Sequence, residues 1–291
     1  MPIFIRETVG APDGFDDLGE EGRISLAYQM TPVDEPRTIQ IRTDHREWRM
    51  TPRGFLNCIV DTDAKREFVG RSERYILAKN TNFIFTFTGR LSGWRDFDLA
   101  PDQSGDRGIL SIAVHPEKQK SYAAFVIAAD KSGPIEFGSA GIHGKLKEFE
   151  ACFKRQVNVN FVQKGQLNEL EFPELDMRRP GPLFLSQFRA AIEQKIGTVA
   201  DRHIVFAWNV EGKVDVGDQG MTFGYGARYC YVDQFSPWST IAHEIGHTFH
   251  LSDLDGRHPK NIMSPIHGVN RFNMTQIETL RSVIDPQPPS R

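Results

Sequence analysis

The pentapeptide from His243 to His247 constrains the fold and chemistry of this chain more than any other feature of its sequence. Its residues are His-Glu-Ile-Gly-His. Because residues four apart lie on one face of an α-helix, His243 and His247 can direct their imidazole rings at the same metal ion. Glu244 lies beside them, where a carboxylate can accept a proton without binding the metal. The pattern therefore predicts a helix that carries two metal ligands and a general base, which is typical of zinc sites.

A second group of residues follows this motif at defined distances. Asp253 lies six residues after His247, and Met263 lies ten residues after Asp253. A third ligand at this distance, followed by a methionine in a tight turn, resembles the metzincin clan of zinc endopeptidases. With aspartate as the third ligand, the chain is most similar to the snapalysin-like branch. The resemblance implies one catalytic Zn²⁺ held by His243, His247 and Asp253, with Met263 as an apolar floor in a Met-turn.

One position departs from the metzincin pattern and leaves the third ligand open. His250 stands where the clan has glycine, at the point where the chain turns after the helix. Histidine tolerates positive φ better than most residues do, so the turn can persist. If the helix continued instead, His258, Asp255 or His250 itself would compete with Asp253 for the metal. A zinc site of another clan, with Glu278 as third ligand, would leave Asp253 and the methionine unexplained.

The resemblance also implies where a substrate would lie. Metzincins bind an extended peptide antiparallel to an edge strand, and residues 227–232 are expected to form that strand. Some metzincins place a tyrosine two residues after the turn methionine, where it assists the oxyanion. Pro265 occupies that position, so Tyr229 and Tyr231 are the candidates for this assistance. His267 follows the turn and is a candidate for the wall of the substrate pocket.

Composition excludes several other kinds of function. The chain has 291 residues, a net charge of −3 and no basic stripe, so no nucleic-acid partner is expected. It contains no apolar run of ~18 residues, so no membrane span is expected. Cys58, Cys152 and Cys230 form no recognisable disulfide framework or zinc pattern. The loop 215–220 could bind Ca²⁺ through its oxygens, but it lacks alternating carboxylates, and a glycine-rich turn is favoured.

The first part of the chain is predicted to be a β-rich domain, residues 1–135, with a sandwich or small-barrel architecture. Apolar and polar residues alternate at 24–30 and 83–87, which is the period of half-buried strands. The segments 109–114 and 122–128 flank a polar turn and are expected to form a hairpin. No residue of this domain matches a catalytic pattern, so its predicted role is substrate recognition or regulation.

Residues 141–286 are expected to form the metzincin-like catalytic domain, followed by an extended tail at 287–291. Ser236 is the expected N-cap of the motif helix, with Pro237 at its first position. The expected order of elements is a helix at 145–155, a strand at 157–162, a helix at 182–196, strands at 204–210 and 227–232, the motif helix at 238–249 and a last helix from Asn273. Metzincin domains have this order, so the predicted fold class is α+β, with a twisted mixed sheet, an active-site helix and a Met-turn.

The resemblance therefore implies a zinc-dependent endopeptidase that acts on a peptide or protein substrate, with Glu244 activating water. Two alternatives stay open. One is a specialised zinc amidase or effector acting on one partner protein or on a cell-wall peptide. The other is a non-catalytic peptide-binding module that retains zinc. A monomer is favoured. Met1–Glu7 lacks the basic start and apolar stretch of a secretory signal, but a peptidase role favours export.

Overall fold

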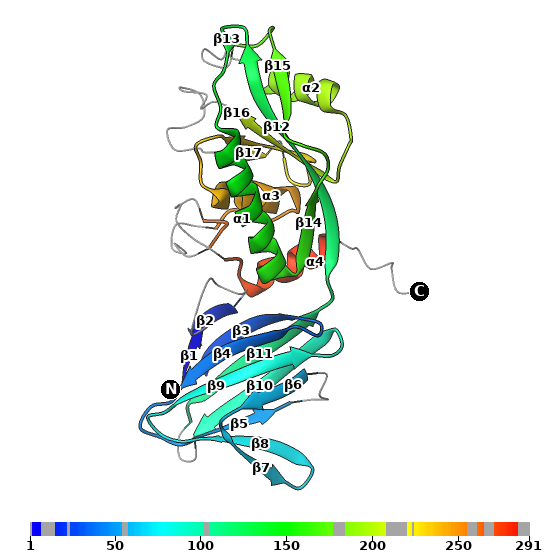
Figure 1. The fold of residues 1–291 in the computed structure, drawn as a ribbon. Helices are drawn as coiled ribbons and strands as arrows, with labels where there is room; N and C mark the ends of the chain where they lie inside the picture. The colour runs from blue at the N-terminus through cyan, green and yellow to red at the C-terminus, as the bar shows by residue number, and fades with distance from the viewer. Residues whose placement is uncertain are drawn as a thin grey trace. The chain divides into compact units, whose positions relative to one another are not determined.

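The fold is α+β, with four helices and three sheets among the residues that the structure describes (Figure 1). The structure is a computed structural model, and it describes residues 2–6, 15–21, 24–53, 58–101, 105–176, 184–207, 220–222, 224–254, 261–264 and 271–284. The chain divides into two compact units. Unit 1 comprises Met1–Lys118, Arg155–Asn158 and Arg271–Met274, and unit 2 comprises Gln119–Lys154, Val159–Asn270 and Thr275–Arg291.

Unit 1 consists of two sheets that share one core. The smaller sheet has the order β1 (Ile3–Arg6), β4 (Pro36–Arg42), β9 (Asn82–Gly89), β6 (Cys58–Thr62). The larger sheet has the order β2 (Phe15–Glu21), β3 (Ile24–Pro32), β11 (Arg107–His115), β10 (Gly93–Pro101), β5 (Trp48–Pro52), β8 (Ser72–Leu77), β7 (Lys65–Val69). Apolar side chains from both sheets meet between them, and Trp48, Phe85 and Phe87 are fully buried there. The alternation of residues 83–87 therefore places their aromatic rings in a core that the two sheets enclose.

The predicted hairpin between residues 109–114 and 122–128 is wrong, although both segments are strands. β11 pairs with β10 and β3 in unit 1, whereas β12 (Lys118–Asp130) belongs to the sheet of unit 2. The chain between the two strands bonds to Asn158 instead of turning back on itself. The Asn158 side chain donates to the His115 carbonyl, and the Asn158 carbonyl accepts from the Lys118 amide. Asn158 is about 40 residues from both His115 and Lys118, so the sequence between the two strands contains no sign of this contact.

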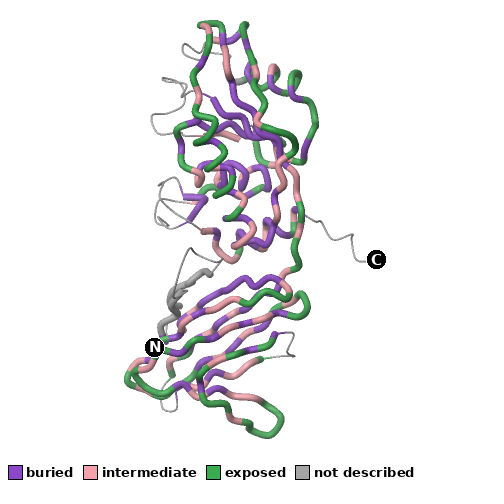
Figure 2. Tube along the Cα trace, in the orientation of Figure 1, coloured by how far each residue is buried: buried purple, intermediate pink, exposed green. Residues whose placement is uncertain are grey.

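Unit 2 is built on a mixed sheet. Its strand order is β13 (Gly133–Pro134), β12, β16 (Arg202–Ala207), β18 (Tyr229–Asp233), β17 (Gly220–Thr222), and β14 (Val159–Gln163) and β15 (Asn168–Phe172) also pair with β12. All or most residues of each of the four helices belong to this unit: α1 (Ser139–Val157), α2 (Phe184–Ile196), α3 (Trp238–Thr248) and α4 (Met274–Ile284). All five residues of β18 are buried, as are five of the six in β16. Figure 2 colours the buried residues purple. Such continuous burial is expected of central strands that are covered on both faces.

β18 is not the edge strand that residues 227–232 were predicted to form. It pairs in parallel with β16 on one side and antiparallel with β17 on the other. Among the described residues, β17 is therefore the outer strand at this end of the sheet. Side chains of β18 alternate between its two faces. Tyr229 and Tyr231 enter a core with α2, while burial and the Glu244 carboxylate of α3 both raise the pKa of Cys230.

The helix that carries the motif begins at the predicted residue, but its N-cap is Pro237 and not Ser236. α3 starts at Trp238, and Pro237 is its N-cap, with no side-chain hydrogen bond to cap it. Ser236 instead lies in a turn in which its amide donates to the Asp233 carbonyl. The three cysteines are buried, and none of them forms a disulfide. Among the described residues, no helix combines the length and apolarity that a membrane crossing requires.

Candidate metal centre

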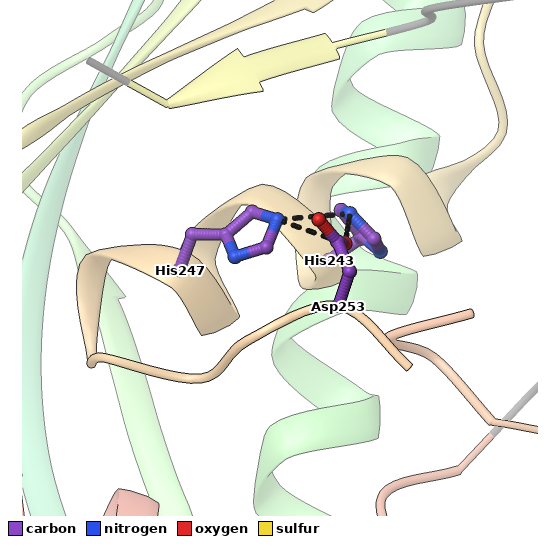
Figure 3. A group of neighbouring side chains, drawn as sticks. All are labelled: His243, His247 and Asp253. Carbon is purple, nitrogen blue, oxygen red and sulfur yellow. Dashed lines mark hydrogen bonds and ion pairs between the residues drawn. The ribbon is translucent and has the colours of Figure 1, made fainter. Parts of the chain in front are cut away.

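The three predicted ligands converge beside α3 (Figure 3). The Nε2 atoms of His243 and His247 lie 3.1 Å apart, and Asp253 Oδ1 lies 3.1 Å from the first and 3.3 Å from the second. The two imidazole planes are at 89°. In a tetrahedral zinc site with bonds of 2.0–2.1 Å, ligand atoms are separated by about 3.3 Å. The spacing of these three atoms thus fits zinc closely.

Backbone carbonyls fix the orientation of both imidazole rings. His243 Nδ1 lies 2.8 Å from the Ile262 carbonyl oxygen, and His247 Nδ1 lies 2.7 Å from that of Leu251. Because a carbonyl only accepts hydrogen bonds, each Nδ1 carries a proton, and Nε2 is left as the ring atom whose lone pair can bind a metal. Two such lone pairs and one carboxylate oxygen then face one another within 3.3 Å. Their mutual repulsion is relieved by a cation, so the arrangement fits a metal ion.

Glu244 adjoins His243 on α3 and is not one of the three converging ligands. It is only 5% exposed, and its Oε2 accepts a hydrogen bond of 2.8 Å from the Thr222 hydroxyl. Gly220 of β17 packs directly against it, since a Cβ there would lie 2.8 Å from Glu244 Cγ and 2.9 Å from Oε1. The backbone of β17 therefore holds the Glu244 carboxylate in one place. Thr222 was not predicted from the sequence, because its role depends on how β17 pairs.

The residues Asn261–Ser264 form a tight turn below the ligands. The Asn261 carbonyl accepts from the Ser264 amide at 3.0 Å, which closes a β-turn. Asn261 Oδ1 also accepts from the Met263 amide at 2.8 Å, and its Nδ2 donates to Gln276 of α4 at 2.9 Å. A single buried asparagine thus shapes the turn and ties it to the last helix.

This turn contacts the metal centre at three points. The Ile262 carbonyl accepts from His243, and the Met263 carbonyl accepts from the Leu254 amide at 2.7 Å, next to Asp253. The Met263 side chain is fully buried against Gly246, where a Cβ would lie 2.6 Å from its sulfur. Only glycine at this position allows the sulfur so close to the helix. The turn therefore orients the His243 ring, positions the chain next to Asp253, and packs the Met263 side chain against α3.

α3 ends in a Schellman motif with His250 in the left-handed conformation. The Leu251 amide donates to the Gly246 carbonyl at 3.1 Å, and the His250 amide donates to that of His247 at 3.0 Å. The φ of His250 is +66°, as the tolerance of histidine for this region allows. His250 is exposed and is not one of the three converging ligands. The reversal brings the Leu251 carbonyl to His247 and lets the chain return with Asp253.

Tyr229 and Tyr231, predicted to assist the oxyanion, do not face the ligands. The Tyr229 hydroxyl donates to the Gly197 carbonyl, and its ring stacks on His203 at 4.7 Å between centroids. The Tyr231 ring packs against Phe188 of α2. The prediction is wrong because strand alternation turns both rings to the face of the sheet opposite α3.

Among the described residues, the only cluster with ligand spacing contains Asp253 and not Glu278. Several other predicted positions lie outside the described residues: His258, Asp255, His267, Pro265, the segment 215–219 and the tail 287–291.

A tyrosine that sequence reasoning missed lies beside the centre. The Tyr225 ring is 5.7 Å from the His247 ring, edge-on, and is 61% exposed. The flanking residues Gly224 and Gly226 both have positive φ. The Gly-Tyr-Gly sequence was the available signal, because glycines on both sides favour a tight turn that presents the residue between them.

No protein-family model matches this chain, and no curated protein sequence matches it. Among solved structures, archaemetzincin from Methanopyrus kandleri aligns with 58% of this chain and 96% of its own, at 14% identity and a TM-score of 0.37. Metalloproteinase-II from Bacteroides fragilis aligns with 97% of this chain and 90% of its own, at 11% identity and a TM-score of 0.33. These scores are too low to establish a family or a function. The functional argument therefore rests on the geometry of the centre.

Proposed function

We propose that this protein is a zinc-dependent peptidase that hydrolyses internal peptide bonds. The observation that carries the proposal is the convergence of His243 Nε2, His247 Nε2 and Asp253 Oδ1 within 3.3 Å of one another. Glu244 adjoins His243 on the same helix, and its carboxylate is held by Thr222. Three protein ligands leave a fourth position of tetrahedral zinc open, which is the arrangement of catalytic rather than structural zinc sites. A structural zinc needs no carboxylate base beside it, so Glu244 favours hydrolysis over binding alone.

Different residues of this chain have different roles in the proposed reaction. When bound, zinc supplies a Lewis acid that lowers the pKa of water to about 7 and polarises a carbonyl. Glu244 accepts the proton of the attacking water and delivers it to the leaving amine. The Thr222 hydroxyl, which donates to Glu244 Oε2, orients that carboxylate. The carbonyls of Ile262 and Leu251 hold the two imidazole rings.

The substrate is proposed to lie along β17 as an additional strand. Among the described residues, β17 pairs with β18 on one side only, and its backbone lies directly against Glu244. An extended peptide that pairs antiparallel with β17 would place a carbonyl near the three ligands, and backbone hydrogen bonds would supply affinity without selecting a sequence. β17 therefore has the substrate-binding role that the resemblance to metzincins had implied for residues 227–232.

Cleavage of an unbiased peptide mixture, followed by mass spectrometry, tests the proposal. Zinc-loaded wild type is expected to produce cuts that a chelator abolishes and added zinc restores. The variant Glu244→Gln should bind one zinc as the wild type does, because Glu244 is not a ligand, and should produce no cuts. His247→Ala should lose the zinc itself. Cuts that persist in Glu244→Gln would contradict the assigned base. Zinc-loaded wild type that cuts no peptide and no unfolded protein would favour the binding module.

A further inference from the structure

Tyr225 combines exposure to solvent with contact to a buried metal ligand. The residue as a whole is 61% exposed, whereas the side chain of His247, on which its ring packs, is only 12% exposed. The ring centroids are 5.7 Å apart and the planes are at 68°. One edge of the ring therefore contacts the ligand while much of its surface faces solvent. An exposed aromatic surface at such a place is available for contact with a bound molecule.

The backbone holds this ring in place. Gly224 has a φ of +119° and Gly226 a φ of +76°, and the Ala227 amide closes the turn on the Gly224 carbonyl at 3.0 Å. The Gly226 amide donates to the His247 carbonyl at 3.2 Å. The His250 ring lies so close to Gly226 that a Cβ there would be 2.6 Å from it. These contacts attach the turn to the carboxyl end of α3, and they keep the backbone of Tyr225 close to His247.

The direction of the chain places Tyr225 relative to a substrate. Gly220 and Thr222 of β17 contact Glu244, and Gly226 contacts His247. β17 therefore lies beside the base, and the turn at Gly224–Gly226 that follows it in the chain lies beside the second ligand. A peptide antiparallel to β17 runs the opposite way. Its residues before the cleaved bond then lie toward Tyr225, and its residues after the bond lie toward Gly220.

We infer that Tyr225 is a specificity-determining residue, which forms the wall of the subsite for the side chain on the amino side of the cleaved bond. The inference rests on the proposed peptidase function. The exposed ring surface favours an apolar or aromatic substrate side chain, since both surfaces leave water when they meet. A glycine or a carboxylate side chain at that position gains nothing from the ring. The enzyme therefore cleaves preferentially after leucine, methionine, phenylalanine or tyrosine.

The test compares kcat/KM for two peptides that differ only in leucine or glycine before the cleaved bond. Wild type is expected to prefer leucine by roughly tenfold or more, and Tyr225→Ala should reduce this ratio to about three or less. Tyr225→Phe keeps the ring and should keep the ratio within about twofold of wild type. Phe235→Ala is the matched control, since it removes a ring that is 69% exposed at the amino end of α3, and it should leave the ratio as in wild type. Bound zinc is measured in every variant.

The possible results distinguish a failure of the Tyr225 inference from a failure of the proposed peptidase function. If wild type cleaves peptides but Tyr225→Ala keeps the leucine preference, the inference fails and the proposed function stands. If Tyr225→Phe loses the preference as fully as Tyr225→Ala, the hydroxyl and not the ring surface makes the contact, which also overturns it. If Tyr225→Ala loses zinc and slows both peptides equally, Tyr225 positions His247 and does not select the substrate. If zinc-loaded wild type cleaves neither peptide nor any in the mixture, both proposals fail.

Discussion

His250 occupies a backbone conformation that is unfavourable for any residue with a Cβ. Its φ of +66° costs a non-glycine residue about 1–2 kcal/mol, and the reversal of the chain after α3 requires it. Glycine removes this strain but gains entropy in the unfolded state. We predict that His250→Gly raises the free energy of unfolding by about 0.5–1 kcal/mol, measured by urea denaturation. His250→Ala keeps the Cβ and should give no gain. Loss of stability in the glycine variant would mean that the contact of the ring with Gly226 outweighs the strain.

His203 makes stability depend on pH. It is fully buried, and burial lowers the pKa of its imidazole from the ordinary value of 6.5. The Val199 amide donates to its Nε2 at 3.3 Å, so the neutral ring is the form that the core accommodates. As pH falls below 6.5 the unfolded chain binds a proton that the folded protein does not, and the unfolded state is favoured. The contribution of the neutral ring is thus complete above pH 6.5 and is lost as pH falls toward the lower pKa of the folded state.

We therefore predict that the free energy of unfolding decreases from pH 7 to pH 5, and that His203→Gln flattens this dependence. Urea denaturation at several pH values measures the free energy of unfolding of the variant and of wild type. Titration of the metal ligands affects both proteins equally, so it cancels in the difference between them. His143→Gln is the control, because His143 is exposed on α1. Equal slopes in all three proteins would show that His203 is not the titrating group.

The turn at Asn261–Ser264 is the element on which the metal centre depends beyond its ligands. Asn261→Ala removes the acceptor for the Met263 amide and the donor to Gln276, and both partners lie in a buried site. We predict a loss of roughly 1–3 kcal/mol in the free energy of unfolding and roughly tenfold weaker zinc binding. The weaker binding follows because the turn presents the carbonyl that holds His243.

A chelator competition titration measures the zinc affinity of these variants, and urea denaturation measures their stability. Asn261→Asp keeps an oxygen for the Met263 amide but cannot donate to Gln276. It should therefore fall between wild type and the alanine variant in both measurements. If Asn261→Ala loses stability but binds zinc as tightly as wild type, the turn contributes to folding without positioning the ligand.

The elements that sequence predicts well are those whose signals are local. Helical spacing places His243 and His247 on α3, and strand alternation places the aromatic rings of β9 in a core. Asp253 and Met263 were predicted from the resemblance to metzincins, and the Asp253 carboxylate lies within 3.3 Å of both imidazole rings. β17 could not be predicted in this way, because Gly220–Thr222 is short and lacks alternation. Its pairing with β18 decides which strand lies outermost, and so Thr222 and Tyr225 acquire their positions only through that pairing.

At the scale of the whole molecule, each unit has a hydrophobic core built from its own residues. The core of unit 1 contains Trp48, Phe85 and Phe87 from its two sheets, and all of its members precede residue 118. A second core packs Phe188 and Tyr231 between α2 and the sheet of unit 2. Each core is large enough to support cooperative unfolding of its own unit. The ligands of the candidate metal centre all belong to unit 2, so zinc should stabilise that unit directly.

Calorimetry should consequently resolve two transitions that respond to different changes. Removal of zinc lowers the midpoint of the transition of unit 2, because a bound ligand stabilises only the native state that binds it. Phe87→Ala lowers the other midpoint, since a fully buried ring packed against Phe85 and Phe97 contributes about 3–5 kcal/mol. Phe188→Ala, the matched substitution in unit 2, should act on the zinc-sensitive transition. A single transition that both zinc removal and Phe87→Ala displace together would contradict this, because it would mean that the two cores unfold as one cooperative unit.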